Sequence, residues 1–125
     1  MLGTYDPVAT IAVGDLGAAR AFYEGVLGLQ PYGKSRPGTA VYRAGSTSLL
    51  VYVSDFAGTN RATAVTWTIT SGIEALVERL AAAGVTFEHY PEGGMTIKGD
   101  LHVGHGMKIA WFKDPDGNFH ALAEE

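Results

Sequence analysis

The sequence carries the same order of landmarks twice, and this repeat constrains the fold more than any other feature. Each landmark of the first copy recurs 56 residues later: Val13 and Ile69 end apolar strand patterns, Asp15 and Ser71 precede helices, and Gly28 and Gly84 follow them. Such self-similarity is expected when two copies of one structural unit are joined in one chain. An α+β meander without an internal repeat is the alternative.

The first copy is predicted to fold as a strand, a helix and then three strands. Residues 8–13 alternate small and β-branched side chains, which is typical of a strand. Asp15 can accept hydrogen bonds from the N–H groups at a helix start, and Gly28 suits the left-handed residue that ends a helix. Strand patterns return at residues 39–43 and 48–53, joined by a turn.

The second copy repeats this order. A strand is predicted at residues 64–70, and Ser71 with Glu74 has the spacing of a capping box that starts a helix. Further strands are predicted at residues 86–90, 107–113 and 119–123, with a glycine-rich stretch before Gly106. The expected fold class is α+β, with two tandem βαβββ modules in a single domain of residues 1–125. Module one covers about residues 5–54, the linker 55–61 and module two about 62–125.

Composition excludes several classes of function. The formal net charge of −4 gives no electrostatic support to nucleic-acid binding. The chain has no cysteine, which excludes disulfides, thiolate catalysis and cysteine-rich zinc sites. Its first ten residues lack the pattern of a secretion signal, and no stretch is apolar enough to cross a bilayer. We expect a cytoplasmic protein that acts on neither membranes nor nucleic acids.

Two segments resemble one known family. Residues 21–29, AFYEGVLGL, on the first helix and residues 112–118, FKDPDGN, before the last strand are similar to the vicinal oxygen chelate superfamily. That group contains glyoxalase I, extradiol dioxygenases, fosfomycin-resistance enzymes and bleomycin-binding resistance proteins. The resemblance runs through both modules and implies curved mixed sheets around a cleft, in a chain that forms a homodimer. It predicts the fold well and the activity poorly, because the superfamily supports several chemistries on one scaffold.

The resemblance also implies where a metal ion would bind. Metal-dependent members carry histidine or glutamate on the first strand of each module and glutamate on the last strand, and these positions fall on Val8, Ala64 and Ala121. None of these side chains has a nitrogen or oxygen donor for a metal. His120 is one residue out of phase with Ala121, so a strand directs it toward a helix. We therefore expect a cleft without metal and without a cofactor.

Small and aromatic residues on the predicted strands and linker are the candidate ligand contacts. Threonine hydroxyls can donate or accept hydrogen bonds, and aromatic walls suit a flat or bulky organic molecule. The candidates are Thr10, Tyr42, Tyr52, Phe56, Asn60, Thr66, Thr68 and Trp111. Core packing is the competing role for the aromatic residues, and alternation allows only about half of them to face the cleft. Tyr52 is favoured because its strand position resembles one that carries a carboxylate in metal-dependent relatives.

Two histidines in the glycine-rich stretch keep other functions open. His102 and His105 could provide a general base near neutral pH, or could be relocated metal ligands if a bent loop brings them together. The predicted function is metal-independent binding of a small aromatic or bulky organic molecule. The alternative is an enzyme of the lyase or dioxygenase type, either metal-free with a histidine base or with relocated histidine ligands. Whether the cleft is built within one chain or between two is open.

Overall fold

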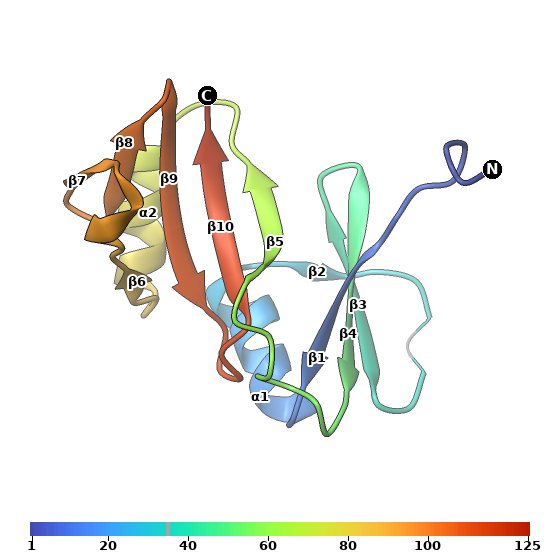
Figure 1. The fold of residues 1–125 in the computed structure, drawn as a ribbon. Helices are drawn as coiled ribbons and strands as arrows, with labels where there is room; N and C mark the ends of the chain where they lie inside the picture. Colours follow the sequence, from blue (N-terminus) through green and yellow to red (C-terminus); the bar gives the residue numbers. More distant parts are fainter. Residues whose placement is uncertain (35) are drawn as a thin grey trace. The chain divides into compact units, whose positions relative to one another are not determined.

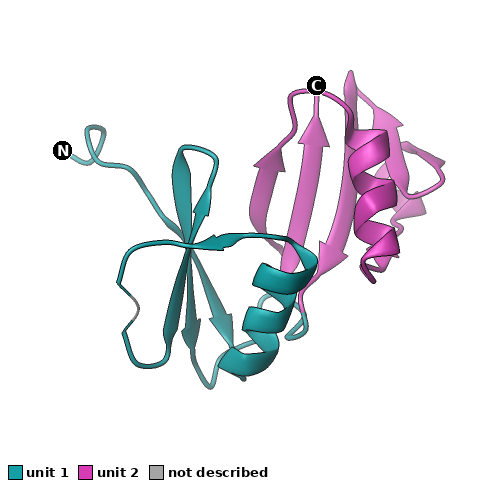
Figure 2. Cartoon of the chain, turned by 180° about the vertical axis from the view of Figure 1, so that it is seen from behind, with its two compact units in different colours: residues 1–60, 115–118 teal, residues 61–114, 119–125 magenta. Residues whose placement is uncertain are grey.

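The structure is a computed structural model that describes residues 1–34 and 36–125. The chain forms two compact units. Unit 1 contains residues 1–60 and 115–118, and unit 2 contains residues 61–114 and 119–125 (Figure 2). Each unit has one mixed β-sheet and one main helical segment, so the expected α+β class with two mixed sheets is confirmed.

Unit 1 is built on a four-stranded sheet in the order β1-β4-β3-β2 (Figure 1). Its elements are β1 (Ala9–Val13), α1 (Leu16–Arg20), the π-helix η1 (Ala21–Val26), β2 (Gln30–Pro31), β3 (Thr39–Ala44) and β4 (Thr47–Val53). β1 runs parallel to β4, and the other pairs are antiparallel. Asp15 caps α1 as predicted, because its Oδ1 accepts the N–H groups of Gly17 at 2.8 Å and Ala18 at 3.3 Å.

The core of unit 1 lies between the helical segment and one face of the sheet. Alternate side chains of β1 and β4 point to this face, and Ile11, Val13, Leu49 and Val51 are each at most 2% exposed. The helical segment contributes Tyr23, which is fully buried. The other face of the sheet stays open to solvent.

A turn from late in the chain completes unit 1. Residues 115–118 belong to unit 1 although β9 and β10, which they connect, belong to unit 2. Asp116 Oδ1 accepts the Gly14 N–H at 3.0 Å, and Asn118 Nδ2 donates to the Ala12 carbonyl at 2.9 Å. Gly58 has φ +76°, and a Cβ at this position would lie 2.4 Å from the Asp116 carbonyl oxygen. Only glycine therefore fits beside the turn.

Unit 2 contains a larger sheet in the order β5-β10-β9-β8-β7, with β6 paired to β9. Its elements are β5 (Thr63–Thr68), α2 (Ile73–Ala82), β6 (Phe87–Glu88), the 3₁₀ helix η2 (Pro91–Gly93), β7 (Thr96–Lys98), β8 (Leu101–Gly104), β9 (Met107–Lys113) and β10 (Phe119–Glu124). β10 is parallel to β5 and antiparallel to β9. The β7–β8 hairpin lies in the glycine-rich stretch before Gly106, where the sequence predicts no strand. It forms because Gly99, at φ +62°, connects two short strands.

The start of α2 corrects one prediction. The predicted capping box of Ser71 and Glu74 does not form, because the N-cap is Gly72, which makes no side-chain cap. Glu124 of β10 takes this role, since its Oε2 accepts the Ile73 N–H at 2.8 Å. Glu74 instead binds Lys108. In the described part of the chain, no helix combines the length and the hydrophobicity that crossing a membrane requires.

Candidate ligand-binding site

The sheet of unit 2 presents an open face opposite α2. Thr66 of β5 is in register with Ala121 of β10, which is in register with Trp111 of β9. These three side chains therefore form one row across three neighbouring strands. Thr66 is exposed, Trp111 is half-buried and Ala121 is 5% exposed. Thr68 begins the next row on the same face, so the structure brings three predicted contacts of the second module together.

The sheet of unit 1 also has a face opposite its helical segment, and this face carries predicted contacts of the first module. Thr10 is in register with Leu50, and Ala12 with Tyr52. Ile11 and Val13 point to the opposite, buried face. Thr10 is exposed and Tyr52 is 38% exposed, so both predicted contacts of this strand pair are accessible on one face.

Tyr42 does not lie on the open face, which corrects its predicted place among the cleft residues. It is in register with Leu49, and both side chains are buried against the helical segment. The Tyr42 hydroxyl donates to Glu24 Oε2 at 2.8 Å, and its ring stacks on Tyr23 with centroids 6.1 Å apart. The physical reason is the phase of β3, which directs Tyr42 to the core face.

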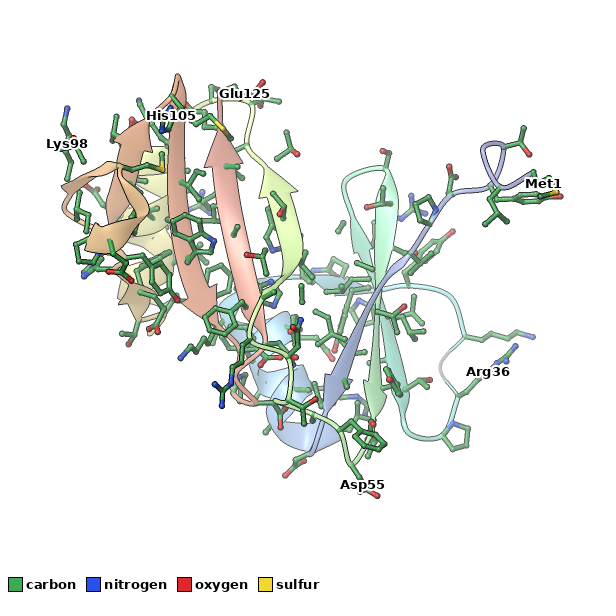
Figure 3. The ribbon with its side chains drawn as sticks, in the orientation of Figure 1. Met1, Arg36, Asp55, Lys98, His105 and Glu125 are labelled. Carbon is green, nitrogen blue, oxygen red and sulfur yellow. The ribbon has the colours of Figure 1, made fainter. Side chains whose placement is uncertain are left out.

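The loop after β4 holds the two remaining candidates, Phe56 and Asn60. Figure 3 labels Asp55 in this loop. Ser54 organises it, because its Oγ accepts the Phe56 N–H at 3.1 Å and its carbonyl accepts the Ala57 N–H at 3.3 Å. The Phe56 side chain is 77% exposed and Asn60 is exposed. The structure places both in a surface loop of unit 1 rather than on its sheet.

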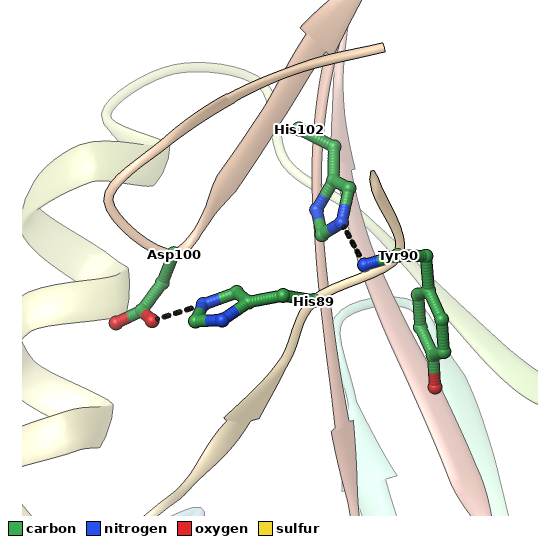
Figure 4. Close-up of polar contacts among 4 residues, drawn as sticks. All are labelled: His89, Tyr90, Asp100 and His102. Carbon is green, nitrogen blue, oxygen red and sulfur yellow. Dashed lines mark hydrogen bonds and ion pairs between the residues drawn. The ribbon is translucent and has the colours of Figure 1, made fainter. Parts of the chain in front are cut away.

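His102 lies on the open face of unit 2 beneath aromatic rings. It is 1% exposed, and its ring meets Trp111 edge-to-face with centroids 4.8 Å apart. Its Nε2 accepts the Tyr90 N–H at 2.8 Å, while Nδ1 has no hydrogen-bond partner among the described residues (Figure 4). Because Nε2 is the acceptor, the neutral ring carries its proton on Nδ1. His102 thus has no available lone pair for a general base in this arrangement.

His105 lies apart from this aromatic cluster, in the hairpin turn between β8 and β9 (Figure 3). It is exposed and has φ +52°. Among the described residues, no group of three or more histidine, aspartate or glutamate side chains is arranged to hold a metal ion. His102 and His105 are therefore not joined into a ligand set.

His120 packs on the helix side of the unit 2 sheet, as its phase predicts. It is fully buried, its Nδ1 accepts the Trp67 Nε1–H at 3.0 Å, and its ring stacks on Phe112 with centroids 4.9 Å apart. Burial lowers the pKa of His120 to about 4, and the Asp114 carboxylate opposes this shift. His120 is thus a neutral core residue that stabilises the fold.

With this geometry established, comparison with known proteins identifies the family. The sequence model of the Glyoxalase/Bleomycin resistance protein/Dioxygenase superfamily matches residues 5–121. The chain belongs to this superfamily. A comparison with curated proteins found no significant match.

Solved structures of the superfamily share the fold. A glyoxalase family protein from Enterococcus faecalis has a TM-score of 0.75 at 22% identity, covering 99% of this chain and 100% of that one. Lactoylglutathione lyase from Agrobacterium tumefaciens has a TM-score of 0.72 at 18% identity, covering 97% and 93%. Fosfomycin resistance protein FosX from Mesorhizobium loti has a TM-score of 0.68 at 16% identity, covering 100% and 94%. At these identities, the likeness shows the fold alone.

The metal positions expected for the superfamily do not fit a metal here. Ala64 is exposed on β5, Ala121 faces the open side of β10 and Val8 immediately precedes β1. Each offers only an alkyl group, which cannot coordinate zinc, nickel, iron or manganese. The side chains at these three positions therefore do not fit the metal ion that metal-dependent members of the superfamily bind.

Sequence reasoning missed the role of Tyr90 in this site. Its ring meets Trp111 edge-to-face with centroids 5.5 Å apart, and its N–H fixes His102. The sequence predicts a strand at residues 86–90, but β6 (Phe87–Glu88) ends before Tyr90, so strand alternation does not give the direction of its side chain. The only signal in the sequence is a cluster of aromatic and histidine residues around Tyr90. Such a cluster does not indicate toward which face of the sheet the Tyr90 ring points.

Proposed function

We propose that the chain binds a small aromatic or bulky organic molecule on the open face of its sheets, without a metal ion. The row of Thr66, Ala121 and Trp111 is the observation that carries this proposal. A hydroxyl, a methyl group and an indole are presented by three neighbouring strands of one sheet. In this proposal the indole offers a flat apolar surface, the alanine methyl adds an apolar contact, and the threonine hydroxyl orients a polar ligand atom.

The surroundings of Trp111 favour binding over catalysis. Tyr90 and His102 both contact the indole edge-to-face, with ring centroids 5.5 and 4.8 Å away. A rigid aromatic wall loses little side-chain entropy when a ligand binds. Thr66, Thr68 and Trp111 do not titrate near neutral pH, and the His102 lone pair is used by Tyr90. We therefore infer sequestration of the ligand, in the manner suggested by the resistance proteins of the superfamily name.

Fluorescence of single-tryptophan variants tests the proposal. Trp67→Phe leaves Trp111 on the open face, and Trp111→Phe leaves Trp67 on the helix face. A panel of flat aromatic compounds, with bleomycin and fosfomycin added, is titrated into protein treated with EDTA. A ligand should change the emission of the Trp67→Phe variant saturably and leave that of the Trp111→Phe variant unchanged. Thr66→Val should weaken binding by about 3- to 10-fold through loss of one hydrogen bond.

Thr63→Val is the matched control, because Thr63 is an exposed residue at the start of the same strand, outside the row. It should leave the affinity unchanged. The proposal fails if no compound of the panel binds, or if Trp111→Phe binds as tightly as the wild type. Binding that appears only after nickel, zinc, manganese or ferrous iron is added would instead support a metal-dependent lyase or dioxygenase.

The homodimer and the cytoplasmic location stay predictions of the sequence. The homodimer rests on the family resemblance. Sedimentation equilibrium would measure the oligomeric state, and cell fractionation would measure the location.

A further inference from the structure

Unit 1 contains a cavity of about 220 Å³ that is separate from the open face. It lies where the helical segment meets β2 and β3, and its polar walls are Arg20, Glu24, Tyr32 and Tyr42. Tyr42 reaches it from the core face of the sheet, opposite to the face that carries Thr10 and Tyr52. The ligand site proposed above, on the open face, does not use any of these residues.

Two side chains of opposite charge, the described residues Arg20 and Glu24, line this cavity and form no ion pair with each other. Arg20 and Glu24 are four residues apart, a spacing at which an α-helix normally brings such side chains together. Arg20 is the last residue of α1, and the chain continues as the π-helix η1, in which the Leu27 N–H bonds to the Phe22 carbonyl at 2.9 Å. Among residues 1–34 and 36–125, the Arg20 side chain makes no hydrogen bond or ion pair.

Glu24 is fixed by a different partner. Its Oε2 accepts the Tyr42 hydroxyl at 2.8 Å, and Tyr42 is 1% exposed. Burial, and then the hydrogen bond to Glu24, raise the pKa of Tyr42 well above its usual value, which keeps its hydroxyl a donor. A buried tyrosine therefore orients the Glu24 carboxylate. Short π-helical segments of this kind often occur at functional sites.

Tyr32 adds an aromatic side chain to the lining of the cavity. The Arg43 guanidinium lies 4.0 Å from its ring centroid, which restrains the ring by a cation–π contact. The cavity thus combines a cation that lacks an ion-pair partner, an oriented carboxylate and a restrained aromatic ring.

We propose that this cavity binds a small zwitterion of the α-amino-acid class. The ligand carboxylate pairs with Arg20, and the ligand ammonium pairs with Glu24, while the ligand side chain packs on Tyr32. Paired charges of this kind give shorter and stronger hydrogen bonds than neutral groups. A neutral molecule would leave both protein charges uncompensated, so the cavity selects for the zwitterion. No bond is made or broken.

Matched probes test the charge requirement. L-phenylalanine is compared with phenethylamine, which lacks the carboxylate, and with 3-phenylpropionate, which lacks the ammonium. L-alanine, ethylamine and propionate repeat the comparison with a small side chain. Binding is followed by the backbone amide signals of the protein in two-dimensional NMR. At least one zwitterion should shift the signals of Gly33 and Val41, with an affinity about tenfold or more above that of its single-charge analogues.

Variants locate the two charges. Arg20→Gln should lower the affinity for the bound zwitterion about tenfold, and Glu24→Gln should do the same while keeping an acceptor for Tyr42. Arg79→Gln is the control, because Arg79 is an exposed residue on α2 in unit 2. It should bind as the wild type does.

Three outcomes overturn the proposal: no probe shifts the cavity signals, the three compounds of a set bind equally, or both variants bind like the wild type. Shifts confined to Thr66 and Trp111 would also count against it, because they report the open face. Since the probes and signals differ, this site and the proposed function can fail independently.

Discussion

At the scale of single residues, His120 shows how a polar side chain becomes part of a core. Its Nδ1 is matched by the Trp67 indole, and its ring stacks between aromatic neighbours. A buried imidazole is stable there only in its neutral form, because charging it would require desolvation of a cation. The direction of the pKa shift follows from this cost.

Stability should therefore fall as the medium becomes acidic. The folded protein holds His120 neutral down to a pKa of about 4, whereas the ordinary value is 6.5. The unfolded chain binds the proton first, so this contribution is complete above pH 6.5 and is lost between pH 6.5 and 4, about 3 kcal/mol in total. Urea unfolding at several pH values measures it. His120→Gln should flatten the profile and the exposed His105→Gln should not; an unchanged slope in His120→Gln would contradict the assignment.

Residue directions were predictable only where the phase of a strand could be fixed. Thr66 and His120 face as alternation predicts, because the helix-facing apolar residues of β5 and the position of Ala121 set their phase. For Tyr42 the sequence shows an aromatic residue on a neighbouring strand but does not fix the phase of β3, and alternation allows only about half of such residues to face the cleft. Its partner Glu24 lies on a separate element, so local pattern gave no signal for it.

At the scale of elements, the two repeated helices begin in different ways. α1 is capped by the neighbouring Asp15, which the sequence shows directly. α2 is capped by Glu124, 51 residues away from Ile73. A long-range cap depends on sheet topology and cannot be read from the local spacing of Ser71 and Glu74. The β7–β8 hairpin was missed for a related reason, since its strands have three and four residues and show too little alternation.

Removing the long-range cap should destabilise α2. Glu124→Ala leaves the Ile73 N–H without its acceptor, and we expect a loss of about 1 kcal/mol in the free energy of unfolding. Glu125→Ala removes the same charge one residue later, where the side chain is exposed, and should change stability by less than about 0.5 kcal/mol. Chemical denaturation followed by circular dichroism compares them. Equal losses would show that the effect is one of charge rather than capping.

At the scale of the whole molecule, the repeat predicted two modules, and two compact units are present. What the repeat did not predict is that residues 115–118 belong to unit 1. The 56-residue spacing describes each module as a continuous segment, so it contains no information about a turn that contributes to the other unit. The hydrogen bonds of Asp116 and Asn118 to the β1 end are the physical cause, and they span more than 100 residues of sequence.

This turn should make unfolding cooperative across the chain. Gly58→Ala places a Cβ against the Asp116 carbonyl and a side chain at φ +76°, so we expect a loss of about 3 kcal/mol or more. Gly45→Ala, at φ +57° in open space, should lose only about 1–2 kcal/mol. Both tryptophans, Trp67 and Trp111, lie in unit 2, so their fluorescence reports that unit. The Gly58→Ala transition should shift equally by fluorescence and by circular dichroism. A fluorescence midpoint that stays unchanged would show independent units.

The place of this turn in the chain also bears on biosynthesis. A ribosome releases the N-terminal residues first, and domains generally begin to fold in that order. Unit 1, however, includes residues 115–118, which emerge only after residues 61–114 of unit 2 have been made. Until then the nascent chain exposes the Gly14 N–H and the Ala12 carbonyl to water and to chaperones. Unit 1 begins before unit 2 in the sequence, yet it can be completed only after most of unit 2 has been translated.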